Sequence, residues 1–307
     1  MVNLDFRPPG LEMRAAFEEI VWREKISSCQ FAFAAVFSLQ DKYGTEVCII
    51  EGRLFLRSRR RTPGRVDYFA PLCAAEHFAE SVAAVEASAA DEGLPYALFG
   101  LTEQNVEALR RIAPGRYLIE EQRDWAEYIY DTRSLATLEG SALKQKRKDA
   151  RICRKTYGER LTTEPLTAQN AADAWVFQQE WYAYHQNGGE AGEQLAAEHR
   201  AIRCALTHYT ALGLTGVLLR LEGRVVGYSY GCPVGGQTYD ILVQKAAPDV
   251  KYLYRVVFQE AVRQCAMDCA YVNAEEDIGL EGLRKLKLSY HPLLLLRKFN
   301  AVPGEEL

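Results

Sequence analysis

The feature that most constrains the fold is an order of predicted elements that occurs twice in the 307-residue chain. In each half, two helical stretches precede a pair of strands joined by a Glu-Gly dipeptide. A third strand, a helix, a strand, a helix and a final strand then follow. Residues 50–53, Ile-Glu-Gly-Arg, correspond to residues 221–224, Leu-Glu-Gly-Arg. Short matches arise by chance, so the shared order is the stronger evidence, and it predicts two copies of one α/β unit.

The length supports the same division, because a single hydrophobic core stops growing at roughly 250 to 300 residues. The sequence therefore predicts domains at 1–130 and 131–307, with the functional cleft in the second. A formal net charge of -4 argues against a dedicated nucleic-acid binder. The beginning of the chain lacks a secretion signal, and no apolar run approaches the roughly 18 residues that span a bilayer. We expect a soluble cytoplasmic protein.

Metal and nucleotide motifs are missing from the sequence. The eight cysteines and five histidines show no spacing typical of metal ligands or redox pairs, so we expect reduced, mostly buried thiols and no metal site. No GxGxxG follows a predicted strand and no GxxxxGKS occurs, which excludes the usual dinucleotide and triphosphate loops. We also expect no tightly bound cofactor.

The order of elements resembles the GCN5-related N-acetyltransferase fold, an acyl-CoA N-acyltransferase-like mixed sheet, taken twice in tandem. Tandem copies of this fold resemble transferases that move amino acids from aminoacyl-tRNA onto peptidoglycan precursors or phosphatidylglycerol. The stretch NAEEDIGLEGLRKLKLSYHP, 273–292, strengthens the resemblance, together with SCQFAFA near the start and YIYDTRSLATLEG before KQKRKDARI. These stretches resemble a bacterial family described as similar to the C-terminal domain of phosphatidylglycerol lysyltransferase, over about Phe31 to Phe299.

This resemblance implies an acyl or aminoacyl transferase whose donor is acyl-CoA or aminoacyl-tRNA. The acceptor would be an amine or a hydroxyl, with a phospholipid headgroup as one candidate. The alternative is a non-catalytic binding module that kept the fold and lost the donor-binding turn. A shared fold does not transfer a substrate, so the function depends on the individual residues of the site.

The donor-binding stretch departs from the acetyltransferase pattern. In acetyltransferases of this fold, a glycine-rich turn before the central helix holds the donor pyrophosphate with backbone N–H groups. The corresponding residues 245–255, KAAPDVKYLYR, contain no glycine, and Pro248 has no N–H to offer. Lys245, Lys251 and Arg255 could hold phosphates through side-chain charge instead. Their alternative role is ordinary solvated surface.

Three consecutive carboxylates, Glu275, Glu276 and Asp277, lie between a predicted strand and a predicted helix. Asp277 would cap that helix with its negative charge at the positive end of the helix dipole. Glu275 would lie beyond the carboxyl end of the strand, where ligands tend to bind in open α/β sheets, and could bind an acceptor amine or act as a general base. Asn273 belongs to the same polar group. The alternative is a set of structural ion pairs.

Two further residues are candidates for catalysis. Asp240 lies in the otherwise apolar strand QTYDILV, where a carboxylate is costly to bury unless it faces a polar cleft or meets a cation such as Lys245. Tyr290 follows the last predicted helix and could give a proton to a leaving group. Tyrosine also favours strands for its shape, so simple packing is the alternative.

A basic stretch at 143–160 predicts a helix with a thin apolar stripe and a broad cationic face. Lys146 and Arg147 on this stretch are candidates for donor binding. Such a helix could dock phosphates of tRNA, of CoA or of an anionic lipid headgroup. The alternative is a solvated helix that links the two halves.

Overall fold

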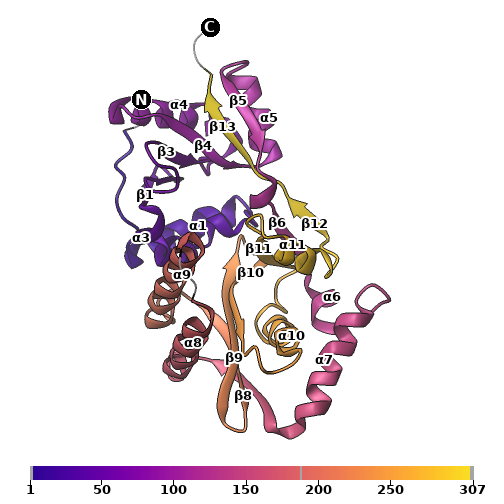
Figure 1. Cartoon of the computed structure of the whole chain (residues 1–307). Coiled ribbons are helices and arrows are strands. Elements are labelled where there is room, and N and C mark those ends of the chain that lie inside the picture. Colours follow the sequence, from indigo (N-terminus) through magenta and orange to yellow (C-terminus); the bar gives the residue numbers. More distant parts are fainter. Residues whose placement is uncertain (1–2, 187–188, 305–307) are drawn as a thin grey trace. The chain divides into compact units, whose positions relative to one another are not determined.

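The computed structural model describes residues 3–186 and 189–304, and its helices and strands are drawn in Figure 1. The chain forms two compact units. Unit 1 takes residues 1–127, 276–279 and 296–307, and unit 2 takes residues 128–275 and 280–295. The sequence predicted contiguous parts, whereas two later segments of the chain return to unit 1.

Unit 1 is built on a six-stranded sheet with the order β1-β2-β3-β4-β13-β5. Most pairs are antiparallel, and β3 and β4 run parallel. Its strands are β1 (Thr45–Ile50), β2 (Arg53–Ser58), β3 (Val66–Phe69), β4 (Tyr96–Leu101), β5 (Tyr117–Glu121) and β13 (Phe299–Pro303). Its α-helices are α1 (Arg14–Arg23), α2 (Phe33–Ser38), α3 (Gln40–Tyr43), α4 (Phe78–Glu92) and α5 (Glu103–Ile112).

Unit 2 is built on a seven-stranded sheet with the order β12-β6-β11-β10-β9-β8-β7. Here β10 and β11 form the parallel pair that corresponds to β3 and β4. The strands are β6 (Glu127–Asp131), β7 (Leu161–Leu166), β8 (Thr215–Leu221), β9 (Arg224–Val234), β10 (Thr238–Ala246), β11 (Tyr271–Glu276) and β12 (Leu294–Leu296). The helices are α6 (Thr132–Thr137), α7 (Lys144–Tyr157), α8 (Ala171–His185), α9 (Gly189–Thr207), α10 (Leu253–Cys265) and α11 (Glu281–Leu288).

The two Glu-Gly dipeptides form equivalent hairpin turns. Glu51 and Gly52 join β1 to β2 with φ of 50° and 70°, and Glu222 and Gly223 join β8 to β9 with φ of 53° and 84°. Two consecutive positive φ values match the twist of the flanking strands in a two-residue hairpin, and glycine meets this requirement without strain. Both predicted hairpins are confirmed.

Each sheet contains one interior strand that is distant in sequence from the two strands beside it. In unit 1, the last strand of the chain, β13, lies between β4 and β5 (Figure 1). In unit 2, β6, which directly follows the first copy, lies between β11 and β12. The two units thus share the order of their elements, and β13 and β6 occupy the same relative position in the two sheets.

The core of unit 1 forms where α4 covers its sheet. Phe78, Val82 and Val85, whose spacing of four and three residues places them on one helix face, pack in one cluster with Tyr68 and Leu98 from the sheet. At about 25 cal/mol per Å² of apolar surface removed from water, such burial is the main stabilising contribution.

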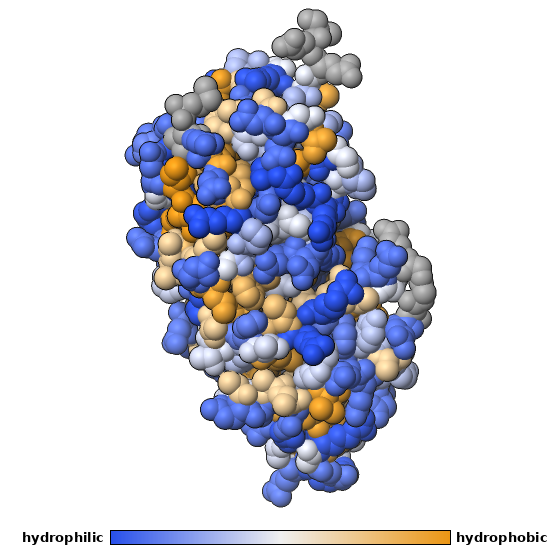
Figure 2. Space-filling model, turned by 90° about the vertical axis from the view of Figure 1, so that its left-hand side faces the viewer, coloured by the Kyte–Doolittle hydropathy of each residue, from blue (hydrophilic) through white to orange (hydrophobic). Residues whose placement is uncertain are grey.

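Within the described ranges, no helix is long and apolar enough to cross a membrane. On the face drawn in Figure 2, hydrophobic residues reach the surface in patches separated by hydrophilic ones.

Candidate functional site

In unit 2, α7 packs alongside α10 and brings the first turns of the two helices together. Near the later part of α7, Arg154 donates to Gln259 at 2.9 Å and to Glu260 at 2.6 Å. Toward the first turns, Asp149 Oδ2 lies 3.9 Å from Arg255 Nε. The basic helix predicted at 143–160 is therefore confirmed as α7, and its apolar side faces a packed helix.

Tyr290 lies where these two first turns meet, and its ring contacts two cations. Lys146 Nζ is 4.6 Å from the ring centroid and Arg255 Cζ is 5.9 Å from it. The ring itself is held edge-on against Phe258, with centroids 5.1 Å apart. We call Lys146, Asp149, Arg255 and Tyr290 the Tyr290 cluster. It combines three residues that the sequence proposed for separate reasons.

The Tyr290 cluster holds more positive charge than it compensates. Lys146 is only 8% exposed and, among the residues that the structure describes, it makes no hydrogen bond or salt bridge. Burial lowers the pKa of Lys146 below its usual value, and the neighbouring Arg255 guanidinium adds to the lowering. Arg255 Nε is also buried without a hydrogen-bond acceptor in the described chain. A buried ammonium beside a guanidinium favours an anion at this place.

Burial raises the pKa of Tyr290 to about 12, against the lowering effect of Arg255. The phenol therefore keeps its proton at neutral pH, so it can donate a hydrogen bond or a proton to a bound group.

The backbone at the start of α10 does not form an open cradle for phosphate. The Leu253 N–H donates to Val250 O at 3.2 Å, and the Arg255 N–H donates to Tyr252 O at 3.0 Å. Tyr252 adopts a left-handed φ of 64° to close this turn. The predicted Lys251 is exposed here, with its Nζ 5.0 Å from the Tyr252 ring. Side chains, rather than N–H groups, supply the positive charge.

Two other predicted donor-binding residues lie outside the cluster. Lys245 on β10 pairs with Glu198 on α9, at 2.8 Å and 2.9 Å, and its Nζ lies 4.1 Å from the Trp181 ring. Lys245 is therefore paired with Glu198 and not with Asp240, so of the two alternatives for Asp240 the ion pair with Lys245 does not form. Arg147 donates to the carbonyls of Leu138 and Gly140, which fixes the turn before α7.

The predicted polar group on β10 and β11 is partly assembled. Asp240 and Asn273 are direct partners in the parallel pairing of the two strands, and both side chains are fully buried. Asn273 Oδ1 accepts the N–H of Glu275 at 2.8 Å. Glu275 itself has a left-handed φ of 57° and is half-buried. The Asp240 carboxylate and the Asn273 amide thus lie on adjacent strands, and Asn273 contacts the strained Glu275 at the end of β11.

Asp277 has the contacts of a turn residue. It belongs to unit 1, is fully buried, and accepts from Arg123 Nη1 at 3.1 Å and from the Gly279 N–H at 3.0 Å. The helix α11 begins at Glu281 without a side-chain cap, so Asp277 does not cap it as expected. The carboxylate closes a local turn and neutralises an arginine instead.

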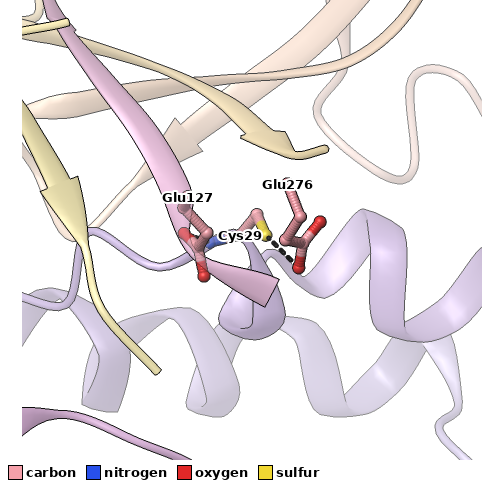
Figure 3. Close-up of side chains that lie close together, drawn as sticks. All are labelled: Cys29, Glu127 and Glu276. Carbon is pink, nitrogen blue, oxygen red and sulfur yellow. Dashed lines mark hydrogen bonds between the residues drawn. The ribbon is translucent and has the colours of Figure 1, made fainter. Parts of the chain in front are cut away.

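Unit 1 contains a charged cluster that sequence reasoning missed. Cys29, Glu127 and Glu276 place one thiol and two carboxylate groups within 4.8 Å of one another (Figure 3). Cys29 Sγ donates to Glu276 at 3.5 Å, and Figure 3 shows the two side chains directed toward each other. This residue set has the chemistry of metal ligands, which makes the partners of Glu127 decisive.

Glu127 already has a cation. Lys298 Nζ lies 2.7 Å from Glu127 Oε1, and the Ser28 hydroxyl and the Cys29 N–H donate to the same carboxylate at 2.6 Å and 2.9 Å. Burial disfavours ionisation, yet Lys298 and these donors hold the pKa of Glu127 below its usual range. A metal ion would have to displace or approach a buried ammonium, so we interpret the cluster as a structural ion pair. The only sequence signal was a charge within each apolar stretch, AEYIY and LLLLRKF.

The chain was compared with known proteins. A family model described as phosphatidylglycerol lysyltransferase, C-terminal, matches residues 24–302. A conserved protein of unknown function from Bacteroides thetaiotaomicron has a TM-score of 0.92 at 27% identity, covering 98% of this chain and 100% of that chain. L-PGS from Bacillus licheniformis has a TM-score of 0.67 at 13% identity, covering 100% and 95%. FemX has a TM-score of 0.58 at 8% identity, covering 98% of both chains. No curated protein matched.

At such low identities, L-PGS and FemX show the fold alone. The predicted fold class, a mixed α/β architecture with two GCN5-related N-acetyltransferase-like units, is confirmed. The family match covers most of the sequence and supports a transferase in general terms. The chain belongs to the phosphatidylglycerol lysyltransferase C-terminal family.

Proposed function

We propose that the chain transfers an acyl or aminoacyl group from a phosphate-bearing donor, aminoacyl-tRNA or acyl-CoA, to an amine or hydroxyl acceptor. A phospholipid headgroup is one such acceptor. The observation that carries the proposal is the Tyr290 cluster, because two incompletely compensated cations and a protonated phenol meet at the first turn of α10. In acetyltransferases of this fold, the turn before the corresponding helix holds the donor phosphates.

A phosphate oxygen beside Lys146 and Arg255 would supply the acceptor that these groups lack. The positive end of the α10 dipole points to the same place and adds to the attraction. Lys251, which is exposed in the preceding loop, can contribute a third charge. This arrangement replaces the missing glycine-rich turn, because charge on side chains takes over the role of backbone N–H groups.

In the proposed reaction, the acceptor nitrogen or oxygen attacks the donor carbonyl carbon and forms the new C–N or C–O bond. The ester bond to tRNA, or the thioester bond to CoA, breaks, and the leaving oxygen or sulfur takes a proton. Tyr290 can supply that proton, since its phenol is neutral at pH 7. We assign the removal of the acceptor's proton to Glu275, the half-buried carboxylate at the end of β11.

Donor binding is tested with Lys146→Met and Arg255→Met against Lys148→Met, which removes the same charge from the exposed side of α7. We expect the first two substitutions to weaken binding of charged tRNA in filter assays, or of CoA thioesters in thermal shift, by about 10- to 100-fold. The Lys148→Met variant should lose no more than about twofold. Equal losses of donor affinity in all three variants would show that the positive charge attracts the donor in a general way and that no specific phosphate site exists.

Chemistry is tested separately with Tyr290→Phe, which keeps the ring under both cations and removes the hydroxyl. We expect kcat to fall by about 10²-fold or more with donor binding unchanged. Donor binding without product in the unmodified protein would instead identify a binding module. Flotation with anionic vesicles at low salt tests the lipid acceptor, because a protein that stays at the bottom does not engage such a surface.

A further inference from the structure

Arg61, in the loop between β2 and β3 of unit 1, is enclosed by aromatic rings. Its guanidinium carbon lies 4.1 Å from the ring centroid of Phe99, 4.5 Å from Tyr43, 5.1 Å from Trp125 and 5.6 Å from Phe69. Aromatic faces attract the positive charge, but they accept few of its five N–H hydrogen bonds.

The Arg61 guanidinium has no hydrogen-bond acceptor in the described parts of the chain. Its Nε and Nη1 atoms are buried and unpartnered. The nearby carboxylate of Asp67 is occupied by Arg65 at 2.7 Å and by the Thr62 hydroxyl at 2.7 Å. Burial lowers the pKa of Arg61 below its usual value, which shows how poorly its charge is compensated. Two buried N–H-bearing nitrogens of a cation without acceptors are costly, so the place favours an added anion.

A second unpartnered donor belongs to the same part of unit 1. Gln30 Oε1 accepts from Lys298 at 3.5 Å, whereas Gln30 Nε2 is buried with no acceptor among the described residues. The Gln30 side chain packs against Gly100, where a Cβ atom would lie 2.2 Å from Oε1, and Gly100 follows Phe99 of the aromatic enclosure. The positive φ of 68° at Gly100 and this close approach both require glycine. Gln30 and Arg61 thus each carry a buried donor without an acceptor, and they contact the neighbouring residues Gly100 and Phe99 of β4.

We propose that unit 1 binds a small organic monocarboxylate, with Arg61 as the charged donor and Gln30 as a neutral donor. A planar carboxylate matches the guanidinium in shape and balances its single charge. A phosphate dianion would leave a second negative charge in an aromatic environment that also feels Glu276 and Asp67. The site is separate from the Tyr290 cluster and does not depend on the transferase proposal.

The test is thermal shift and calorimetry on the full chain with sodium acetate, inorganic phosphate and sodium chloride at equal ionic strength. Acetate should raise the Tm of the unmodified protein above the chloride value, and phosphate should not. The matched control is Arg60→Met, because the Arg60 side chain is exposed and donates to the Asp41 carbonyl. Arg60→Met should keep the acetate response, and Arg61→Met should lose it, with affinity at least about 10-fold weaker.

The proposal is overturned if acetate and chloride act alike, if phosphate binds as well as acetate, or if Arg61→Met binds acetate normally. If Arg61→Met loses its circular dichroism signal and so does not fold, acetate binding is measured on the Arg61→Lys variant instead. Lysine keeps the charge but not the planar fork, so acetate affinity should fall about 10-fold. Unchanged affinity in a folded Arg61→Lys variant contradicts the proposed geometry.

Discussion

Two buried lysines, one in each unit, show how differently a fold can treat the same charge. Lys298 in unit 1 is 1% exposed, and its ammonium contacts the Glu127 carboxylate and the Ser28 hydroxyl. Lys146 in unit 2 is 8% exposed, and among the described residues its ammonium forms no salt bridge; it lies 4.6 Å from the Tyr290 ring centroid, and Asp149 attracts it more weakly than Arg255 repels it. The first lysine is fully compensated, whereas the second is held next to a further cation.

The difference separates a structural charge from a functional one. A compensated ion pair of this kind resists removal of either partner, because the remaining charge stays buried alone. A poorly compensated cation costs stability and is retained where a ligand supplies what is missing. The two lysines should therefore respond to the same substitution with opposite signs, and the following predictions test that contrast.

The largest effect is expected for Lys298→Met. It leaves the Glu127 carboxylate buried without its cation, so the free energy of unfolding should fall by about 3–5 kcal/mol in urea denaturation. The double substitution Glu127→Gln with Lys298→Met removes both charges and should recover much of this loss. A loss below about 1 kcal/mol in the single variant would show that the pair is not buried as described.

A smaller effect of opposite sign is expected for Lys146→Met. Removing the uncompensated ammonium should raise the free energy of unfolding by about 1 kcal/mol while donor binding falls. Lys148→Met, on the exposed side of the same helix, should change stability by less than about 0.5 kcal/mol. If Lys146→Met is destabilising, Lys146 has a structural partner and the contrast with Lys298 fails.

The stability difference between the unmodified protein and Lys146→Met should depend on pH in a defined direction. The folded pKa of Lys146 lies below the unfolded value of 10.5, so between the two the unfolded state binds more protons. The stability advantage of Lys146→Met is therefore full below the folded pKa and shrinks as pH rises toward 10.5. Urea denaturation of the unmodified protein and of Lys146→Met, at pH values from 7 to about 10.5, measures this advantage. An advantage that grows with pH contradicts the assignment.

The smallest effect is expected for the stability of the double variant Glu127→Gln with Lys298→Met at acid pH. The folded pKa of Glu127 lies below its unfolded value of 4.5, so its contribution is full above that value and is lost as pH falls through the folded pKa. The double variant without both charges should lose this part of the acid sensitivity. Identical acid unfolding of the two proteins would show that Glu127 titrates normally.

Local chemistry made much of the fold predictable. The Glu-Gly hairpins, the apolar face of α4 and the Thr102 cap of α5, which forms a full capping box, follow from turn preference and helical periodicity. The inserted positions of β6 and β13 do not follow, because a short strand has the same alternation in whichever sheet it pairs.

The candidate site was predictable only as separate residues. Lys146, Arg255 and Tyr290 are far apart in the sequence, and nothing in their local patterns brings them to one place. Their meeting depends on the packing of α7 along α10, a long-range contact. Glu127 and Lys298 were missed for the same reason, because the local sequence around either residue does not indicate its partner.

The insertion of β13 and β6 has a consequence for how the chain can be divided. A cut between residues 130 and 131 would leave the first fragment with β4 and β5 separated by a gap, and would leave most of β6 on the wrong piece. Each fragment would lack an intact interior strand of its sheet. We therefore expect neither fragment to fold on its own. Each unit therefore needs strands from both sides of such a cut to complete its sheet.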